Sequence, residues 1–489
     1  MRSKTPLPFA EWAPDRAIIS GVSSEALGVV RLGGRFVPLK TAVPLRASWS
    51  MADTAIGGAG FYDDAGRVHI FTGDRTAIYR VQDRAPVNIS KIGGYNVAPD
   101  WGWVFEQFGS TIYATARGLP QIQFFTLGTS PRFNDVTTGP GYSNTLFRVR
   151  EFLFSGYGKT LKSSAFNNPL DWVPDAGTQS IEVDLPHDGG DIVIGTGGQF
   201  GLVFQERKTH RIVYTGGDTV FDRDEIEEKR GALGPNAICR FGALTFFACD
   251  DGIRATDGNQ SQGIGEGKID RYFTSRLNYT ARAAVSLACD VERKILYVAF
   301  PTGGSSTPNE LLVYSIADGQ WTRDDASYHL LFEAPRPGVS LYDDEAVTAV
   351  AGTTLVDSIN LTVDSSVWRE SRKQVMAVTT AREICTFEGS NRPAVMETGY
   401  GEIMPGRKAF VSEIWPLTDA ATVSASVTTK LSRLSDTATN GPLSTMNAHG
   451  FCPVMAEARW MRARVEIPFA TAWTEASGID WDAEPAGEL

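Results

Sequence analysis

The chain has 489 residues, of which 42% are hydrophobic and 21% charged, so it has the composition of a globular protein with a large body or more than one domain. Its net charge of −11 argues against a general nucleic-acid-binding surface, although DNA could still slide past such a chain. No apolar run reaches the roughly 18 residues that a membrane span needs, so we expect no stable membrane insertion.

The first 50 residues read as an N-terminal arm. Proline-marked turns at Trp12–Asp15 and Arg35–Pro38 flank a short apolar stretch, Leu27–Leu32. The basic start of the chain is not followed by the apolar stretch of a signal peptide, so we expect a protein made in a cytoplasm.

From about residue 60 to about residue 355, short strand–turn–strand units recur every 42 to 51 residues. The turn centres are Gly66, Gly109, Glu151, Phe200, Ala243, Lys294 and Asp344. This spacing is the period of a β-propeller blade. About seven units predict an all-β ring of six to eight small sheets around an axis.

The middle units are the clearest. Asp191–Gly195 and Gly201–Phe204 are two predicted strands joined by a glycine-rich turn, and Asp250–Gly252 is a strong hairpin signal between two apolar runs. We expect Trp321 to pack between neighbouring sheets. Two stretches could form short helices between blades, 224–230 and 268–277.

Near residue 376 this rhythm stops. The alternating stretches Val423–Thr428 and Arg462–Ile467 predict antiparallel strands with one solvent-facing side, and therefore a second, β-sandwich-like domain. Trp481–Leu489 reads as an acidic tail. The predicted organisation is thus an arm over 1–50, a propeller over 51–375 and a C-terminal β domain over 376–489.

Motifs that carry chemistry are weak in this sequence. Ser155–Thr160 ends like a phosphate-binding P-loop, but Leu153 stands where the motif needs glycine, so a glycine-rich hairpin turn is expected. The carboxylates of Asp222–Glu228 lack the order and glycine of an EF-hand and predict a solvated acidic turn.

The five histidines are widely spaced and the five cysteines form no CxxC pair, so we predict no metal site, no cofactor and reduced, mostly buried thiols. No GxSxG elbow is present. Trp101, Trp103 and Tyr95 could stack on a carbohydrate, although inter-blade core is the more common use of such aromatics.

We therefore predict no catalytic residue and no enzymatic activity. The sequence leaves one alternative open: 57 acidic residues could supply two carboxylates from different blades, as in a propeller-fold glycan-active enzyme, and a carbohydrate-binding module stays a related possibility.

Several segments together resemble a known family. Glu11–Asp15 and Gly33–Pro38 resemble the start of short-tailed phage structural proteins. The central part is similar to the tail nozzle and packaged-DNA stabilisation (tail hub) family, over about residues 140 to 325. The segments that carry this second similarity are Asp188–Gly195, Leu202–Glu206, Ile212–Gly217, Gly231–Ala237 and Phe246–Gly252. Residues 376–489 carry little of the pattern.

The resemblance implies a structural protein of the virion tail, assembled in the bacterial host cytoplasm. Family members form a homohexameric ring that closes the tail channel, retains the packaged genome and becomes the conduit for DNA ejection. Implied partners are the tail adaptor (head-to-tail connector) ring, tail fibres or a tail needle, and double-stranded DNA in the lumen. The resemblance also implies a docking role for the arm, including Trp12, Pro14 and Asp15.

Overall fold

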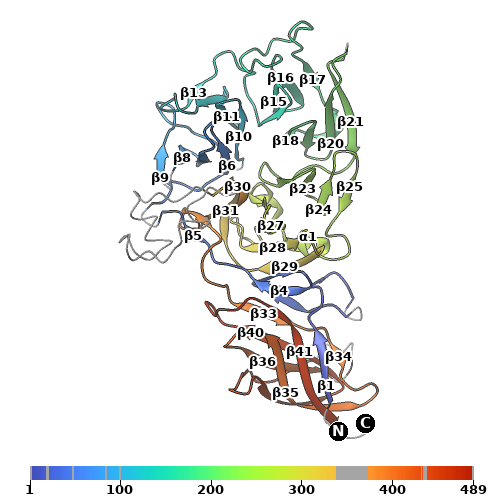
Figure 1. Ribbon diagram of the computed structural model, residues 1–489. Helices are drawn as coiled ribbons and strands as arrows, with labels where there is room; N and C mark the ends of the chain where they lie inside the picture. Colours follow the sequence, from blue (N-terminus) through green and yellow to red (C-terminus); the bar gives the residue numbers. More distant parts are fainter. Residues whose placement is uncertain are drawn as a thin grey trace, which may run out of the picture.

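The computed structural model describes residues 3–17, 21–46, 49–82, 85–98, 101–217, 219–336, 373–430, 432 and 438–486. Nearly all of the regular structure in this part is antiparallel sheet (Figure 1). It forms a β-propeller of seven four-stranded sheets and a smaller β-sandwich-like domain, here called the platform. The predicted fold class, an all-β propeller with an additional sandwich-like domain, is confirmed.

Each blade follows one plan, in which the first strand lies innermost and the following strands step outward. Blades 1 to 3 consist of β6 (Gly57–Tyr62), β7 (Val68–Gly73), β8 (Ile78–Gln82) and β9 (Ala85–Asn88); β10 (Trp103–Phe108), β11 (Thr111–Ala116), β12 (Gln123–Thr126) and β13 (Asn134–Asp135); and β14 (Thr145–Val149), β15 (Phe152–Tyr157), β16 (Thr160–Ser163) and β17 (Glu182–Asp184). Blades 4 and 5 consist of β18 (Ile192–Thr196), β19 (Gly201–Gln205), β20 (Thr209–Tyr214) and β21 (Phe221–Glu227); and β22 (Ile238–Phe241), β23 (Leu244–Cys249), β24 (Gly252–Thr256) and β25 (Ser261–Gly263). Blades 6 and 7 consist of β26 (Ser286–Asp290), β27 (Ile295–Phe300), β28 (Glu310–Ser315) and β29 (Gln320–Asp324); and β30 (Tyr328–Pro335), β31 (Lys373–Thr379), β32 (Ile384–Thr386) and β5 (Val43–Pro44).

The predicted period corresponds to this plan. The turn centres from Gly66 to Lys294 all lie in or beside the connection between the first and second strands of blades 1 to 6, while Asp344 lies outside the described residues. The second strand of blade 6, β27, is buried at every position, because neighbouring blades cover both faces of each sheet. This burial explains the continuous apolar run Ile295–Phe300.

The ring is closed by a strand from the N-terminal region. Val43 and Pro44 of β5 pair with Thr386 and Cys385 of β32. Blade 7 therefore combines a strand that precedes blade 1 in the chain with three strands that follow blade 6. Two predicted domain boundaries are therefore wrong. Residues 43–44 belong to the propeller rather than the arm, and the boundary at 375/376 falls inside β31, because blade 7 continues to Thr386.

The platform is built from two sheets. One sheet has the order β3–β4–β41–β35–β39, with β1 also paired to β41; the other contains β2, β33, β40, β36 and β37, with β34 and β38 at its edges. The strands are β1 (Ser3–Pro8), β2 (Glu25–Leu27), β3 (Val29–Leu32), β4 (Arg35–Pro38), β33 (Ala394–Glu397), β34 (Gly401–Glu402), β35 (Lys408–Thr418), β36 (Ser424–Lys430), β37 (Ala438–Asn440), β38 (Ser444–Thr445), β39 (Cys452–Ala458), β40 (Trp460–Ile467) and β41 (Ala476–Ala486). The two strands predicted at 423–428 and 462–467 correspond to β36 and β40, which pair antiparallel.

The propeller and the platform share a sheet. β2 lies between β29 of blade 6 and β33 of the platform, parallel to the first and antiparallel to the second. This connection produces one sheet of eleven strands that runs from the ring into the platform. Figure 1 shows the platform below the ring, with both chain ends at its far side.

Two further expectations fail and one holds. The segment 224–230 is not a helix, since β21 covers most of it as the outer strand of blade 4. Residues 481–486 are not a tail: Ile479, Trp481 and Ala483 are buried, and β41 is a central strand of the platform. The predicted helix at 268–277 is present as α1 (Asp270–Arg276). In the described residues, no helix is long and apolar enough to cross a membrane.

Candidate functional site

A cavity of about 270 Å³ lies among the first strands of the blades. Its wall includes residues from β6, β10, β18, β22, β26 and β30, so it occupies the centre of the ring. Most of these residues are apolar, and the charged ones are Glu106, Glu333 and Lys373. The volume is below the range of about 300–1,000 Å³ that is usual for sites of drug-sized ligands.

The pKa values of the two glutamates in this cavity are set by the same two influences, burial and the charge of Lys373. Burial raises the pKa of Glu106 and of Glu333 to about 7, while the charge of Lys373 opposes the shift in both. A general acid and a general base need pKa values that are pushed apart. The pKa values of both carboxyl groups are shifted in the same direction.

Two thiols lie beside the cavity. The Sγ atoms of Cys239 on β22 and Cys289 on β26 are 3.1 Å apart, and the Cys289 backbone N–H donates to Oε1 of Glu333 at 3.0 Å. Burial raises the pKa of both thiols. All five cysteines are buried, as predicted, and none is bridged in this structure.

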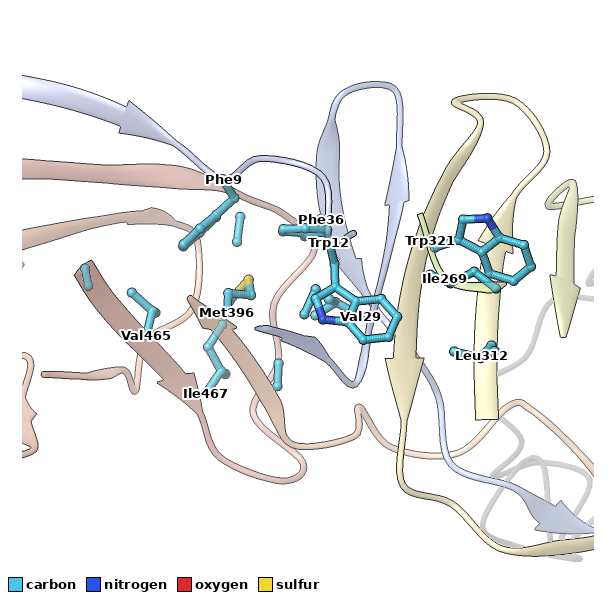
Figure 2. Close-up of a cluster of buried hydrophobic side chains, with 14 of the residues drawn as sticks. Phe9, Trp12, Val29, Phe36, Ile269, Leu312, Trp321, Met396, Val465 and Ile467 are labelled. Atoms are coloured by element: carbon cyan, nitrogen blue, oxygen red, sulfur yellow. The ribbon is translucent and has the colours of Figure 1, made fainter. Parts of the chain in front are cut away.

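The second candidate site is the junction between propeller and platform, where the N-terminal segment lies between the two bodies. Figure 2 shows Trp12 and Val29 in the middle of this junction. On the platform side the labelled neighbours are Phe9, Met396, Val465 and Ile467, and on the blade side they are Ile269, Leu312 and Trp321. The indole N–H of Trp321 donates to the carbonyl of Ile264 at 3.0 Å, which places this side chain between blades 5 and 6, as predicted.

The residues predicted to dock a partner lie at this junction. Trp12 is 3% exposed and packs edge-on against Tyr272 at 5.2 Å. The carboxylate of Asp15 accepts hydrogen bonds from the backbone N–H groups of Arg271 and Tyr272, at 2.7 and 2.9 Å. Trp12 and Asp15 thus dock the arm onto the propeller of the same chain, and Pro14 is the exposed residue of the three. Docking to another protein stays a prediction.

The local motifs have structural roles. Ser155–Thr160 forms the hairpin turn between β15 and β16, with Gly158 at a φ of 56°, as predicted. Asp222, Asp224, Glu225 and Glu227 lie along β21 instead of in a turn, because this outer strand has solvent on its open edge, and Glu228 follows its end. Glu225 and Glu227 of this strand pair with Lys208, Arg230 and Arg254.

The three aromatic residues considered for carbohydrate stacking, Tyr95, Trp101 and Trp103, lie in two different environments. Trp103 and Tyr95 are buried against each other at 4.9 Å, and the Trp103 indole N–H donates to the carbonyl of Asp74 at 2.8 Å. This pair is blade core. Trp101 is half-buried under the guanidinium of Arg117, at 4.8 Å, and lines a smaller cavity next to Arg282 and Tyr279.

Sequence reasoning missed Glu106, Glu333 and Lys373. The available signal was a glutamate inside an otherwise apolar first strand, as in Val104–Phe105–Glu106 and Phe332–Glu333–Ala334. This signal alone does not identify a site, because Glu106 and Glu333 are far apart in the sequence and only the closed ring places both at its centre.

No protein-family model matches the chain, and no curated protein matches it. Among solved structures, the chain is similar to a hypothetical selenium-binding protein from Sulfolobus tokodaii (10% identity, TM-score 0.37, 53% of this chain and 74% of the other). It is also similar to the AfRom2 CNH domain (10% identity, TM-score 0.37, 59% and 90%) and to a streptogramin B lyase (12% identity, TM-score 0.40, 60% and 91%). The propeller assignment rests on the seven sheets of this chain.

Proposed function

We propose that this chain is a structural subunit of the tail nozzle of a short-tailed bacteriophage. In this role it forms, with further copies, a ring below the adaptor that retains the packaged genome and then conducts it during ejection. The N-terminal segment and the C-terminal domain form the platform that docks onto the adaptor ring, while the propeller lies farther out.

The observation that carries this proposal is the shared sheet. Nine strands lie side by side from blade 6 through β2 into the platform, with β34 and β38 paired at the edges of the same sheet, and β2 meets β29 at the pair Leu27–Arg323. Main-chain hydrogen bonds and a common apolar core therefore connect the two bodies, rather than a flexible linker. A stiff elongated subunit is what the wall of a load-bearing channel requires, since pressure on the propeller must be transmitted to the docking end.

Exposed apolar side chains suggest where neighbouring copies meet. Many large ones in the described residues are concentrated between residues 142 and 183, on and beside blade 3. They are Tyr142, Tyr157, Phe166, Leu170, Val173 and Val183. Such a concentration on one blade is typical of an interaction surface rather than of scattered exposure. We assign this surface to contact with the next copy in the ring.

The direct test is microscopy of the purified chain mixed with a tail adaptor ring. We expect sixfold rings, and we expect Val173→Asp, at a position that is 70% exposed, to prevent their formation. Ile92→Asp, at an 84% exposed position on the blade 1 side, is the matched control and leaves rings intact. A chain that stays monomeric in the presence of the adaptor contradicts the proposal.

The charge of the chain suits a lumen that does not grip DNA. Six copies carry 6 × (−11) = −66, and affinity for phosphate comes from neutralisation by lysine and arginine. We expect no tight binding of double-stranded DNA by assembled rings at low salt. Non-specific binding below about 1 μM that persists at physiological salt, where non-specific complexes are usually weaker than this, would show that the lumen holds DNA instead.

One observation bears on the alternative, a glycan-active enzyme. Glu106 and Glu333 do line a common cavity, as two catalytic carboxylates would. Their pKa values shift together, however, and the cavity is small. Hydrolysis of chromogenic glycosides that is abolished by both Glu106→Gln and Glu333→Gln would favour the enzyme, and we expect no turnover.

A further inference from the structure

Three potential metal ligands meet at the wall of the central cavity. In the described part of the chain, Cys239, Cys289 and Glu333 are the one group of three histidine, cysteine or acidic side chains whose ligand atoms all lie within 4.8 Å of one another. They come from the first strands of blades 5, 6 and 7, which are β22, β26 and β30. Separate blades thus place two sulfurs and a carboxylate at one point.

The spacing explains why no local motif reveals this group. Cys239 and Cys289 are 50 residues apart, and Cys289 and Glu333 are 44 residues apart. Each interval is one blade period, so the ligands recur with the architecture instead of with a CxxC or HxxxH pattern. The blade repeat itself brings first-strand side chains together around the axis.

We propose that Cys239, Cys289 and Glu333 bind a zinc-type divalent cation, with a water molecule from the central cavity as the fourth ligand. Zinc favours tetrahedral sets of thiolate, imidazole and carboxylate, and a water commonly completes three protein ligands. With Zn–S bonds of about 2.3 Å, tetrahedral geometry separates two sulfurs by roughly 3.8 Å. The observed 3.1 Å then requires a small rotation of the side chains.

Access and charge fit the proposal. Cys239 and Glu333 line the cavity, so a hydrated ion can reach them and keep one water. Two thiolates and one carboxylate around a divalent cation carry a net charge of −1, and Lys373 in the same cavity wall offsets it. The hydrogen bond from the Cys289 backbone N–H to Oε1 of Glu333 orients the carboxylate toward the sulfurs.

The binding step balances as an exchange of protons for metal. Both thiols are protonated in the free protein, since burial raises their pKa. The cation forms two metal–sulfur bonds and one metal–oxygen bond, and the two thiol protons leave to solvent. A third proton leaves when Glu333 is protonated at the start.

A disulfide between Cys239 and Cys289 is the competing use of the two sulfurs. It requires an oxidant, and it leaves the convergence of Glu333 unused. The metal site accounts for all three groups, which is why we favour it. The metal site and the disulfide predict different behaviour of the reduced protein. Reduced protein that binds no metal is consistent only with the disulfide.

The test is a titration of the reduced, chelator-treated full chain with Zn²⁺, in competition with a chromophoric chelator, and in parallel with Co²⁺. We expect one cation per chain and a thiolate-to-cobalt charge-transfer band in the unmutated protein. Cys239→Ser and Cys289→Ser should each weaken binding by about 100-fold or more, and Glu333→Gln by about tenfold. Cys385→Ser, at another buried cysteine of the propeller, should leave binding unchanged.

The cobalt spectrum needs no variant, so the proposal stays testable even when a substituted chain fails to fold. Reduced wild-type protein that binds neither Zn²⁺ nor Co²⁺ overturns the proposal. So does binding that persists in the Cys239→Ser/Cys289→Ser double variant with a native circular dichroism spectrum. Protein whose two thiols join in air, and which binds no cation after reduction, assigns the pair to a disulfide instead.

Discussion

Arg323 on the outermost strand of blade 6 forms a two-pronged ion pair with Glu25 on β2, with N–O distances of 2.7 and 2.8 Å. Their side chains are 23% and 20% exposed, so water screens the pair only in part. Arg323 is also the residue that pairs with Leu27 of β2 in the shared sheet, and Glu25 lies two residues before Leu27 on the same strand. The pair therefore connects propeller and platform where the backbone pairing between them is shortest.

Replacement of Arg323 by methionine should destabilise the junction. It leaves the Glu25 carboxylate partly buried without its cationic partner, which costs about 1–3 kcal/mol in the free energy of unfolding. Urea denaturation followed by tryptophan fluorescence measures this change. Because the pair joins two bodies, we also expect faster amide hydrogen exchange in β2.

The matched control for this pair is Arg35→Met. Arg35 pairs with Glu475, but both side chains are about half exposed, and such surface pairs contribute about 0–1 kcal/mol. If Arg323→Met costs no more than Arg35→Met, the Arg323–Glu25 pair has no special role in the junction.

Asp15→Ala should loosen helix α1. Asp15 supplies the acceptor for two N–H groups in the first turn of that helix, because its own N-cap residue, Ile269, makes no side-chain cap. Loss of a cap costs about 0.5–2 kcal/mol, whereas Asp15→Asn retains an acceptor and should cost less. Hydrogen exchange of the amides of 270–277 reports the effect. Asp64→Ala, in an exposed turn, serves as the control, and equal exchange in the two alanine variants would contradict the capping role.

Gly60→Ala should weaken ring closure between blades 1 and 7. A Cβ atom at this position would lie 2.5 Å from Cβ of Ala334 on β30, so one of the two innermost strands has to shift. Overpacking of this kind costs about 1–3 kcal/mol. Gly304→Ala is the control, since a Cβ there meets nothing within 4 Å. Thermal unfolding of the two variants measures this difference, and we expect the lower melting temperature for Gly60→Ala. Similar melting temperatures for both variants would disprove the tight contact.

Stability should fall as the pH rises from about 5 to 8. Glu106 and Glu333 have pKa values raised by burial to about 7, against an ordinary value of 4.5, so the folded chain binds more protons between these limits. Their contribution is complete below pH 4.5 and is lost as the pH passes 7. Both side chains line an open cavity, where solvent screening reduces the effect, and we expect a loss of about 1–2 kcal/mol.

Denaturation at both pH values, with a chelator present to exclude bound metal, measures this slope. Asp270 and Asp324 shift in the same direction through burial, so part of the slope remains in any variant of the two glutamates. The Glu106→Gln/Glu333→Gln double variant should nevertheless show a shallower slope than the wild type. An unchanged slope would mean that these carboxyl groups do not titrate in this range.

The propeller can be predicted from the amino-acid sequence, because a blade is a local unit. Turn chemistry at Gly66 or Asp250–Gly252 and the apolar runs beside it act over fewer than about ten residues, and their repetition fixes the architecture. Local sequence patterns alone also led to two wrong predictions, a helix where β21 lies and a tail where β41 lies. An acidic stretch resembles a helix or a tail until a neighbouring strand pairs with it.

Features that depend on distant segments emerge only in the folded chain. The strand that closes blade 7 comes from residues 43–44, and the arm packs against the propeller through Trp12 and Asp15. The meeting of Cys239, Cys289 and Glu333 is likewise invisible in the sequence, since each lies one blade from the next. Ring closure explains this, because it brings residues from successive repeats to one axis, and only the closed ring defines which of them meet.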